Sequence, residues 1–232
     1  MKEVLAIIPA RCGSKTIIDK NIKEFAGKPL MCHSIDHAKN SRLITRVIVS
    51  TDSEDYAKIA KDYGAETPFI RPEEYAQDDT PDLPVFQHAL KWLKENENYE
   101  PDLVINLRPT TPARDPKDID DAITKILESD ADSLRSMVLV KEHPYWMFKM
   151  AEDSVLTPFD PDNSIGKYPR RQLLPPLFIT DGSFDMFKPK NIIEGNLFGE
   201  KMLGHEIDES KKTIDIDTEK DFEQAEKVQE KK

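Results

Sequence analysis

An unbroken apolar run near the start of the chain most strongly limits what this sequence can fold into. The run is Val4-Leu-Ala-Ile-Ile8, and it contains no polar residue. A strand with one face in water alternates apolar and polar residues, whereas a strand buried on both faces is apolar throughout. The run therefore predicts a strand that is covered on both faces. It ends abruptly at Pro9 and passes into a loop.

Strand and helix patterns then alternate along the chain without internal repeats. Further strands are predicted over residues 46–52, 67–70 and 102–106, and helical patterns separate them. Repeated strand–loop–helix units form a parallel sheet with helices on both faces. We therefore expect an α/β fold, a Rossmann-like three-layer sandwich with a mostly parallel sheet. A chain of 232 residues is expected to form one such domain, spanning residues 1–232.

Caps and the spacing of apolar residues indicate the helices. One helix is predicted from Ser53, with Asp52 or Ser53 as its N-cap and Gly64 just past its end. Four apolar residues at helical spacing predict the buried face of a second helix: Leu83, Phe86, Leu90 and Leu93. Two more helices are predicted near residues 117–129 and from Thr218 onward.

The alternation stops near residue 141. Residues 143–176 carry six prolines and little periodicity. A long irregular segment inside a compact domain is usually functional, so we expect an insert at about residues 141–176. Its stretch Tyr168-Pro-Arg170-Arg171-Gln172 is a candidate anion-binding site. A proline-rich surface loop with solvated arginines explains these residues equally well.

Composition narrows the class of partner and the compartment. The formal net charge of −11 argues against nucleic acid or an anionic membrane as the main partner. Cys12 and Cys32 make neither a disulfide framework nor a metal knuckle, so a reducing cytoplasm is the expected location. The first apolar run is too short for a signal peptide. No run approaches the ~20 apolar residues that span a bilayer.

The loop after the first strand carries residues suited to a polyanion such as a triphosphate. It combines three cations with a glycine that lets the backbone approach a ligand: Arg11, Gly13, Ser14, Lys15, Lys20 and Asn21. It matches neither the Walker A nor the Gly-x-Gly-x-x-Gly motif. A basic loop is often only solvated surface. Ligands of α/β proteins, however, bind at the carboxyl ends of strands, which favours a phosphate site here. The same cations could lower the pKa of the Cys12 thiol.

A second candidate site lies near the end of the chain, in Thr213-Ile-Asp215-Ile-Asp217. On a strand, residues two apart point to the same side, so Asp215 and Asp217 would face one point in space. Mg²⁺ typically takes one or two carboxylates together with substrate phosphates and waters. Asp217 is also a good N-cap for the following helix. The basic loop elsewhere in the chain favours the metal.

These motifs together resemble the acylneuraminate cytidylyltransferases, also called CMP-sialic acid synthetases. Eight segments match in order over nearly the whole chain. They are Ile-Ile-Pro-Ala-Arg11-x-Gly13-Ser14-Lys15 with Lys20-Asn21, Val-Ser-Thr-Asp52, Phe-Ile-Arg71-Pro, Asp79-Thr80-Pro-Asp82-Leu-Pro, Leu107-Arg108-Pro-Thr-Thr-Pro-Ala-Arg114, Pro-Arg170-Arg171-Gln172-Leu-Leu-Pro, Asp181-Gly182 and Ile-Asp215-Ile-Asp217.

The resemblance implies that CTP and a nonulosonic acid of the sialic or legionaminic type give a CMP-sugar and pyrophosphate, with Mg²⁺. It implies that the anomeric hydroxyl attacks the α-phosphate in line. Positioning and electrostatics dominate such phosphoryl transfer. It also implies a homodimer in which the insert reaches the neighbouring subunit's active site.

The same resemblance assigns roles to individual residues. The triphosphate would be held by Arg11, Ser14, Lys15 and Lys20, with Lys20 nearest the α-phosphate. The cytidine would contact Asn21, Arg71, Asp79 and Thr80. Mg²⁺ would be held by Asp215 and Asp217, and the residues expected to act in catalysis are Lys20, Arg11 and Asp217.

Three departures from the family pattern put the sugar in question more than the reaction. The phosphate loop reads Thr16-Ile-Ile-Asp19 where the family has a glycine and a proline, and Asp19 adds a charge beside Lys20. Arg108 stands where sialic acid enzymes have Gln, at a position expected to touch the sugar. Asp181-Gly182-Ser-Phe-Asp185 replaces an Asn-Gly-Ala-Ile-Tyr-like run. A GTP-using relative, a metal-dependent glycosyltransferase with an Asp-x-Asp motif and a non-catalytic nucleotide-binding module remain as alternatives.

Overall fold

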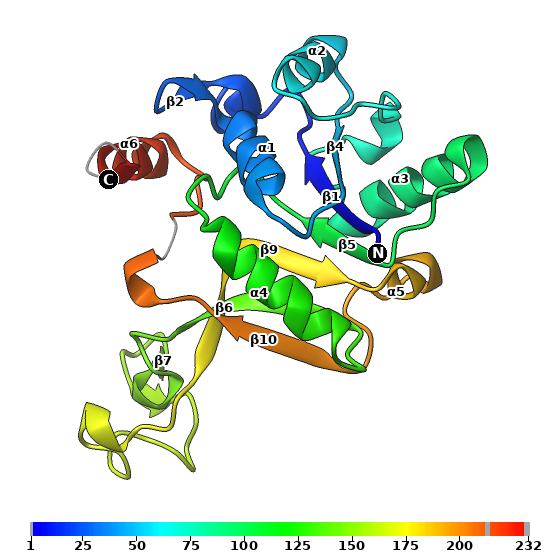
Figure 1. The fold of residues 1–232 in the computed structure, drawn as a ribbon. Helices are drawn as coiled ribbons and strands as arrows, with labels where there is room; N and C mark the ends of the chain where they lie inside the picture. Colours follow the sequence, from blue (N-terminus) through cyan, green and yellow to red (C-terminus); the bar gives the residue numbers. More distant parts are fainter. Residues whose placement is uncertain (1, 212–213, 230–232) are drawn as a thin grey trace.

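A six-stranded sheet forms the centre of the protein, with strand order β10-β6-β9-β5-β1-β4 (Figure 1). The computed structural model describes residues 2–211 and 214–229. The strands are β1 (Val4–Pro9), β4 (Arg46–Ser50), β5 (Leu103–Asn106), β6 (Ser133–Leu139), β9 (Phe178–Phe187) and β10 (Met202–Glu206). Strand β9 is antiparallel to both β5 and β6, while the pairs β1–β4, β1–β5 and β6–β10 are parallel. The mostly parallel sheet predicted from the sequence is thus confirmed.

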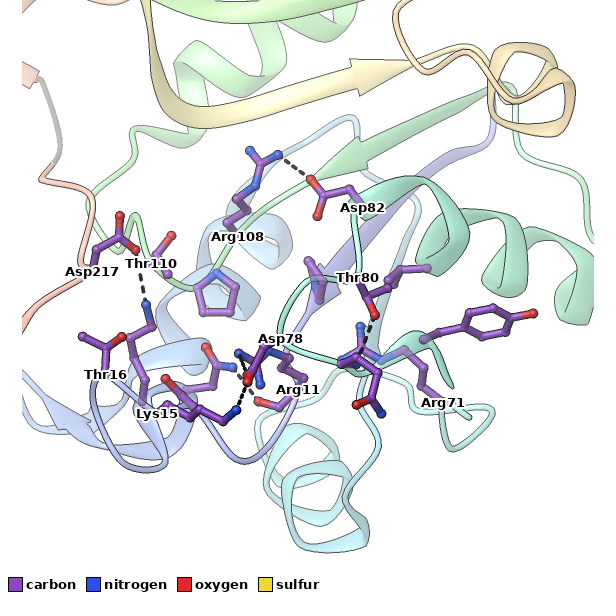
Figure 2. Close-up of a pocket in the computed structure, with 18 residues that line it drawn as sticks. Arg11, Lys15, Thr16, Arg71, Asp78, Thr80, Asp82, Arg108, Thr110 and Asp217 are labelled. Carbon is purple, nitrogen blue, oxygen red and sulfur yellow. Dashed lines mark hydrogen bonds and ion pairs between the residues drawn. The ribbon is translucent and has the colours of Figure 1, made fainter. Parts of the chain in front are cut away.

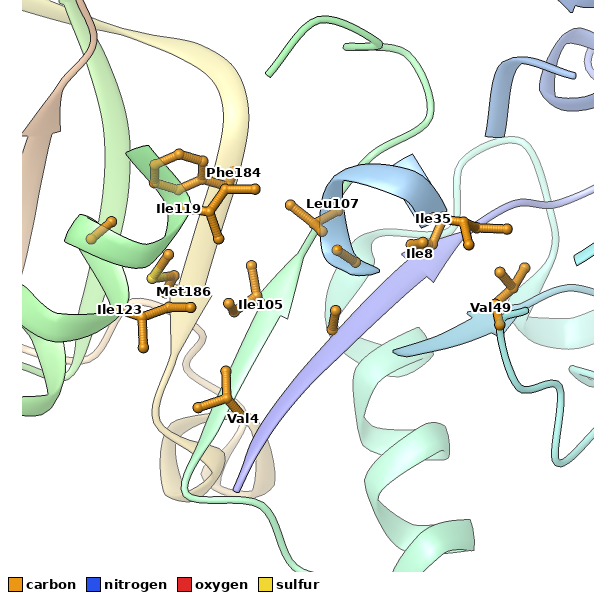
Figure 3. Close-up of a cluster of buried hydrophobic side chains, with 14 of the residues drawn as sticks. Val4, Ile8, Ile35, Val49, Ile105, Leu107, Ile119, Ile123, Phe184 and Met186 are labelled. Atoms are coloured by element: carbon orange, nitrogen blue, oxygen red, sulfur yellow. The ribbon is translucent and has the colours of Figure 1, made fainter. Parts of the chain in front are cut away.

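Helices cover both faces of this sheet, which gives the expected three layers. One face packs against α1 (Leu30–Asn40), α2 (Glu54–Asp62) and α4 (Pro116–Leu127), and the other against α3 (Asp82–Glu97) and α5 (Pro189–Glu194). Side chains of β1 alternate between the two hydrophobic cores. Val4, Ala6 and Ile8 enter the first core, which Figure 3 shows, and Leu5 and Ile7 enter the second. This alternation is why the run is apolar at every position.

Local signals place the helix ends as expected. Ser53 caps α2 by accepting a hydrogen bond from the Tyr56 amide, and Gly64 follows with a positive φ of 86°. Asp115 caps α4 in the same way through the Lys117 amide. The predicted face of α3 is buried at Phe86, Leu90 and Leu93 and partly buried at Leu83.

Two predicted strands are absent from the structure. Residues 67–70 form none: the single bridge in this region, between Ile48 and Glu66, comes just before them. Residues 214–217 also lie outside any sheet, and they are fixed by one backbone bond from Ile216 N to Thr110 O of 2.8 Å. Thr213 lies outside the described residues. Asp215 and Asp217 nevertheless remain exposed while Ile216 is buried, because the segment is extended.

A small third core joins the loop after β1, which the sequence predicts to bind phosphate, to the end of the chain. It contains Ile17 from the loop, Phe25 from the hairpin β2 (Glu24–Phe25)–β3 (Lys28–Pro29), Ile216, and Phe222 from α6 (Glu219–Gln229). The Phe25 and Phe222 rings meet edge to face at 5.4 Å. The third core therefore holds the phosphate loop and the Asp215–Asp217 segment against each other.

The insert leaves the sheet at the end of β6 and returns at the start of β9. It contains the short hairpin β7 (Phe148–Met150)–β8 (Leu156–Pro158) and projects from the body of the protein (Figure 1). Large apolar side chains are exposed along it and its base, including Met150, Leu156, Phe159 and Ile179. Five short 3₁₀ turns complete the structure: Lys20–Ile22, Glu73–Tyr75, Pro144–Trp146, Arg171–Leu173 and Glu209–Lys211. Over the described part of the chain, no helix is both long and apolar enough to cross a membrane.

Candidate active site

A cavity of about 540 Å³ opens at the carboxyl ends of β1 and β5 (Figure 2). Most of the residues predicted for the phosphate and nucleotide lie in its wall. Its lining includes Arg11, Ser14, Lys15, Lys20, Asn21, Arg71, Thr80, Arg108 and Asp217. In the view of Figure 2, Asp217 and Arg71 stand on opposite sides of Arg11 and Lys15. An elongated anion with a ring at one end matches this arrangement.

The phosphate loop, residues 10–20, is anchored by Asp52, which lies two residues after the end of β4. Asp52 Oδ1 accepts a hydrogen bond from the Cys12 amide at 2.9 Å, and Oδ2 accepts one from the Cys12 thiol at 3.0 Å. Gly13 has a φ of 69°, which an L side chain rarely adopts. Buried Asn21 braces the loop by donating from Nδ2 to Arg11 O at 2.9 Å. Asn21 thus supports the loop as well as lining the cavity.

The prediction that the nearby cations lower the pKa of the Cys12 thiol is wrong. The hydrogen bond to Asp52, together with burial, raises the pKa of the Cys12 thiol. Asp52 accepts a hydrogen bond from the thiol, and its effect on the pKa of the thiol outweighs that of the nearby lysine and arginine side chains. Cys12 therefore serves as a protonated donor that ties the loop to β4.

Asp78 is the functional candidate that sequence reasoning missed. Its Oδ1 lies 2.7 Å from Arg11 Nη2, and its Oδ2 pairs with Lys15 Nζ. Asp79, which the sequence analysis expected at the nucleotide, is exposed and does not line the cavity. Two aspartates are adjacent in this loop, and only the backbone conformation decides which one faces the cations.

Lys20 connects the phosphate loop to the carboxylates near the end of the chain. Its Nζ donates to Ile216 O at 2.7 Å and lies 3.5 Å from Asp217 Oδ1. The neighbouring Asp19 is turned away, because its Oδ1 accepts a hydrogen bond from the Tyr56 hydroxyl at 3.1 Å. Asp19 adopts a left-handed conformation with φ of 51°. Asp19, the acidic residue that departs from the family pattern, is thus held at α2 and does not pair with Lys20.

The two carboxylates proposed for a metal are both exposed, but only Asp217 belongs to the cavity lining and Asp215 does not. Asp217 lines the cavity and its side chain is 73% exposed. The alternative that Asp217 caps α6 is wrong, because Thr218 does so. Thr218 Oγ1 accepts from the Asp221 amide at 3.2 Å, and Asp221 Oδ2 accepts from the Thr218 amide at 2.9 Å. No cluster of three or more metal-ligating side chains occurs among residues 2–211 and 214–229. Two carboxylates suffice for Mg²⁺ when substrate phosphates and waters complete its shell.

Arg71 presents unpaired donors at the other end of the cavity. Its side chain is only 3% exposed, and its nearest carboxylate oxygen, Asp52 Oδ1, is 3.9 Å from Nη2. Nε and Nη2 find no acceptor within the described part of the chain. Burial lowers the pKa of this guanidinium. Buried donors are normally hydrogen-bonded, so these two are satisfied only when the side chain shifts or a water or ligand reaches them.

Arg108 belongs to a network of four charges beside the cavity. Its guanidinium pairs with Asp82 at 2.5 Å and with Asp185 at 2.7 Å, and Asp185 also pairs with Arg135 at 2.7 Å. The two carboxylates raise the pKa of Arg108 despite its burial. Arg108 does line the cavity, as expected for a residue near the sugar. Its ion pairs are a finding that the sequence could not supply.

The remaining substrate candidates lie elsewhere within this chain. Arg171 and Gln172 line a separate cavity of about 640 Å³ at the base of the insert. The guanidinium of Arg171 donates to Lys141 O at 2.8 Å. Arg170 is exposed. The structure of the single chain therefore does not bring these three residues to the phosphate loop.

A basic, glycine-containing loop at the carboxyl end of the first strand, with the exposed carboxylate of Asp217 in the same cavity, is typical of an α/β nucleotide-binding protein. The family model for cytidylyltransferases matches residues 5–232. The chain belongs to this family, and it is a nucleotidyltransferase. The resemblance inferred from the sequence is thereby confirmed, and the glycosyltransferase alternative finds no support.

Named relatives agree with this family. A Campylobacter coli protein described as post-translational flagellin modification protein B is 31% identical over 222 residues, covering 96% of this chain and 93% of that protein. Legionella pneumophila CMP-N,N'-diacetyllegionaminic acid synthase is 32% identical over 231 residues, covering 98% and 96%. Escherichia coli N-acylneuraminate cytidylyltransferase is 32% identical over 232 residues, and the match covers 99% of this chain but 53% of that protein.

Solved structures support the fold. CMP:2-keto-3-deoxy-manno-octonic acid synthetase in complex with CTP superimposes with a TM-score of 0.73, covering 99% of both chains. The sequence identity is 15%, so this likeness concerns the fold alone.

Proposed function

We propose that this protein transfers CMP from CTP to the anomeric hydroxyl of a nonulosonic acid of the sialic or legionaminic type. The carrying observation is the cavity itself, whose lining places Asp217 and Arg71 on opposite sides of Arg11 and Lys15. The hydroxyl oxygen forms a bond to the α-phosphorus while the bond to the bridging oxygen breaks, pyrophosphate leaves, and the hydroxyl proton is released to water. Family membership favours CTP over GTP.

The chain's own residues act by binding and by neutralising charge. Arg11 and Lys15 would bind the β- and γ-phosphates, where negative charge develops on the leaving pyrophosphate. Lys20 would approach the α-phosphate while its bond to Ile216 O fixes the Asp217 segment. Arg71, which lines the cavity, would bind acceptor atoms of the cytosine, with Asn21 and Thr80 beside it. Arg108 would face the sugar.

Mg²⁺ would be held by Asp217 at the cavity, with the exposed carboxylate of Asp215 as the second ligand. Bound there, the ion would neutralise phosphate charge and align the α-phosphate with the attacking oxygen. Asp217 already faces the cavity, and its one close cation, Lys20 Nζ at 3.5 Å, is shared with Ile216 O. The carboxylate is therefore available to a metal.

The reaction is tested with CTP, Mg²⁺ and a panel of nonulosonic acids. We expect release of pyrophosphate and a CMP-sugar of the corresponding mass, with no turnover when EDTA removes the metal. GTP in place of CTP should be inert. If CTP binds yet stays intact with every sugar, the non-catalytic module is the correct interpretation.

The working unit that we propose is a cytoplasmic homodimer. Exposed apolar side chains along the insert, such as Met150 and Phe159, form a surface that a second copy would bury. Docking of the insert on the partner would also bring Arg170, Arg171 and Gln172 to the partner's cavity.

A further inference from the structure

The cavity already contains an anion that belongs to the protein. Asp78 extends between Arg11 and Lys15 and pairs with both (Figure 2). These are the cations that the proposed function assigns to the β- and γ-phosphates. A carboxylate and a phosphate cannot occupy the same N–H donors together, so Asp78 and the nucleotide compete.

The two ion pairs are what hold the loop of residues 76–80 against the phosphate loop. All other hydrogen bonds of this loop in the described structure stay within residues 73–80. They are Ala76 N to Glu73 O, Thr80 N to Gln77 O, Gln77 N to Thr80 Oγ1 and Gln77 Nε2 to Glu73 O. Displacing Asp78 would therefore release the loop from the phosphate site without breaking the loop's own structure.

The electrostatics of the contact make the carboxylate an effective competitor. Lys15 and Arg11 lower the pKa of Asp78, so it is charged at neutral pH. The side chains remain accessible, with Asp78 40% and Lys15 82% exposed. Exposed pairs of this kind are individually weak, which allows a more highly charged ligand to replace them. A single carboxylate has fewer charges and acceptor atoms than a pyrophosphate group.

We propose that Asp78 is a specificity residue that occupies Arg11 and Lys15 whenever no pyrophosphate group is bound; this inference rests on the proposed function. CTP and pyrophosphate must displace Asp78 to bind. CMP has a single phosphate and gains nothing from displacing it, so Asp78 discriminates between substrate and the monophosphate part of the product. After transfer, Asp78 competes with pyrophosphate for both cations and speeds the dissociation of pyrophosphate from the site.

Calorimetric titrations of Asp78→Asn with three ligands test this inference. In the presence of Mg²⁺, we expect Kd for CTP and for pyrophosphate to fall about three- to tenfold, the scale of two exposed ion pairs. Kd for CMP should stay unchanged. Asp78→Ala should behave like Asp78→Asn, because both remove the carboxylate. Both variants should melt with the wild type, since the side chain is partly exposed on a loop.

Glu73→Gln is the matched control. It removes the same charge nearby, from an exposed residue outside the cavity lining, and should leave all three Kd values unchanged. Equal tightening of CMP, or the same tightening in Glu73→Gln, would mean that net charge alone acts and would overturn the inference. Unchanged or weaker binding of pyrophosphate to Asp78→Asn would also overturn it. A wild-type protein that binds neither CTP nor pyrophosphate would overturn the proposed function and this inference together.

Discussion

At the scale of single residues, hydrogen bonds decide the chemistry more than nearby charge does. Cys12 lies in a loop with three cations, yet its thiol donates to Asp52 and its pKa is raised. A raised pKa means less thiolate, the reactive form, at any pH below it. The Cys12 thiol is thereby protected from alkylation and oxidation.

The thiol of Cys12 should alkylate slowly at pH 7.5, and Asp52→Asn should accelerate the reaction several-fold. The amide keeps an oxygen for the Cys12 N–H but removes the negative charge that holds the thiol proton. Iodoacetamide labelling followed by mass spectrometry measures the rate. Cys12→Ser should show no labelling, because Cys32 is fully buried. A slower or equal rate in Asp52→Asn would contradict this account.

Asp217→Asn should reduce turnover about 100-fold or more, the scale found when a charge-stabilising group is lost. The melting temperature should stay unchanged, since Thr218 caps α6 and Asp217 is exposed. Steady-state kinetics and a thermal melt check the two parts. Full activity with unchanged Mg²⁺ dependence would remove Asp217 from the metal site.

At the scale of elements, α6 supports the segment of Asp215 and Asp217 that is proposed to hold the metal. Its Phe222 packs into the third core with Ile17 and Ile216, so one small core positions both the phosphate loop and the carboxylates. Lys23 Nζ lies 4.5 Å from the centre of the Phe222 ring and adds to the contact.

Phe222→Ala should therefore raise the Mg²⁺ concentration needed for half-maximal activity as well as lower stability. Truncating a buried phenylalanine costs about 3 kcal/mol, which corresponds to a melting temperature lower by roughly 6–12 °C in a chain of this size. Phe222→Leu should restore most of the Mg²⁺ response, because it refills the core. A destabilised Phe222→Ala protein with a wild-type Mg²⁺ requirement would limit α6 to a structural role.

Sequence patterns predicted the elements whose signals are local. The apolar run of β1, the Ser53 cap and the face of α3 each needed only a few neighbouring residues. The antiparallel direction of β9 was not predicted, because it depends on how the chain returns from the insert. Residues 67–70 resemble a strand, but their Phe69 packs beside α3 without a partner strand. The choice between Asp78 and Asp79 and the partners of Arg108 depend on tertiary contacts, which no local pattern contains.

At the scale of the whole molecule, a single chain separates two parts of the proposed site. The phosphate loop lines one cavity and Arg171 lines another at the base of the insert. A homodimer in which each insert crosses to its partner would combine them.

Arg171→Ala should raise the KM for the sugar strongly while Kd for CTP stays unchanged. The guanidinium can bind a sugar carboxylate bidentately but is remote from the phosphate loop. Mixing Arg171→Ala with inactive Asp215→Asn should restore part of the activity, since a heterodimer has one site with both residues intact. If mass spectrometry shows that subunits exchange and the mixture remains inactive, Arg171 does not act across an interface.

The pairing of β6 with β9 has a consequence for how this enzyme can diversify. Leu139 lies opposite Phe178, and Val140 N donates to Leu177 O at 2.9 Å, so the two ends of the insert are clamped together at the sheet. With its ends fixed, a segment can double in length at a closure cost of only about 0.6 kcal/mol. The insert can therefore be lengthened or replaced as a module, and, with the insert in its proposed place at the sugar, a new acceptor can evolve while the residues around the nucleotide stay as they are.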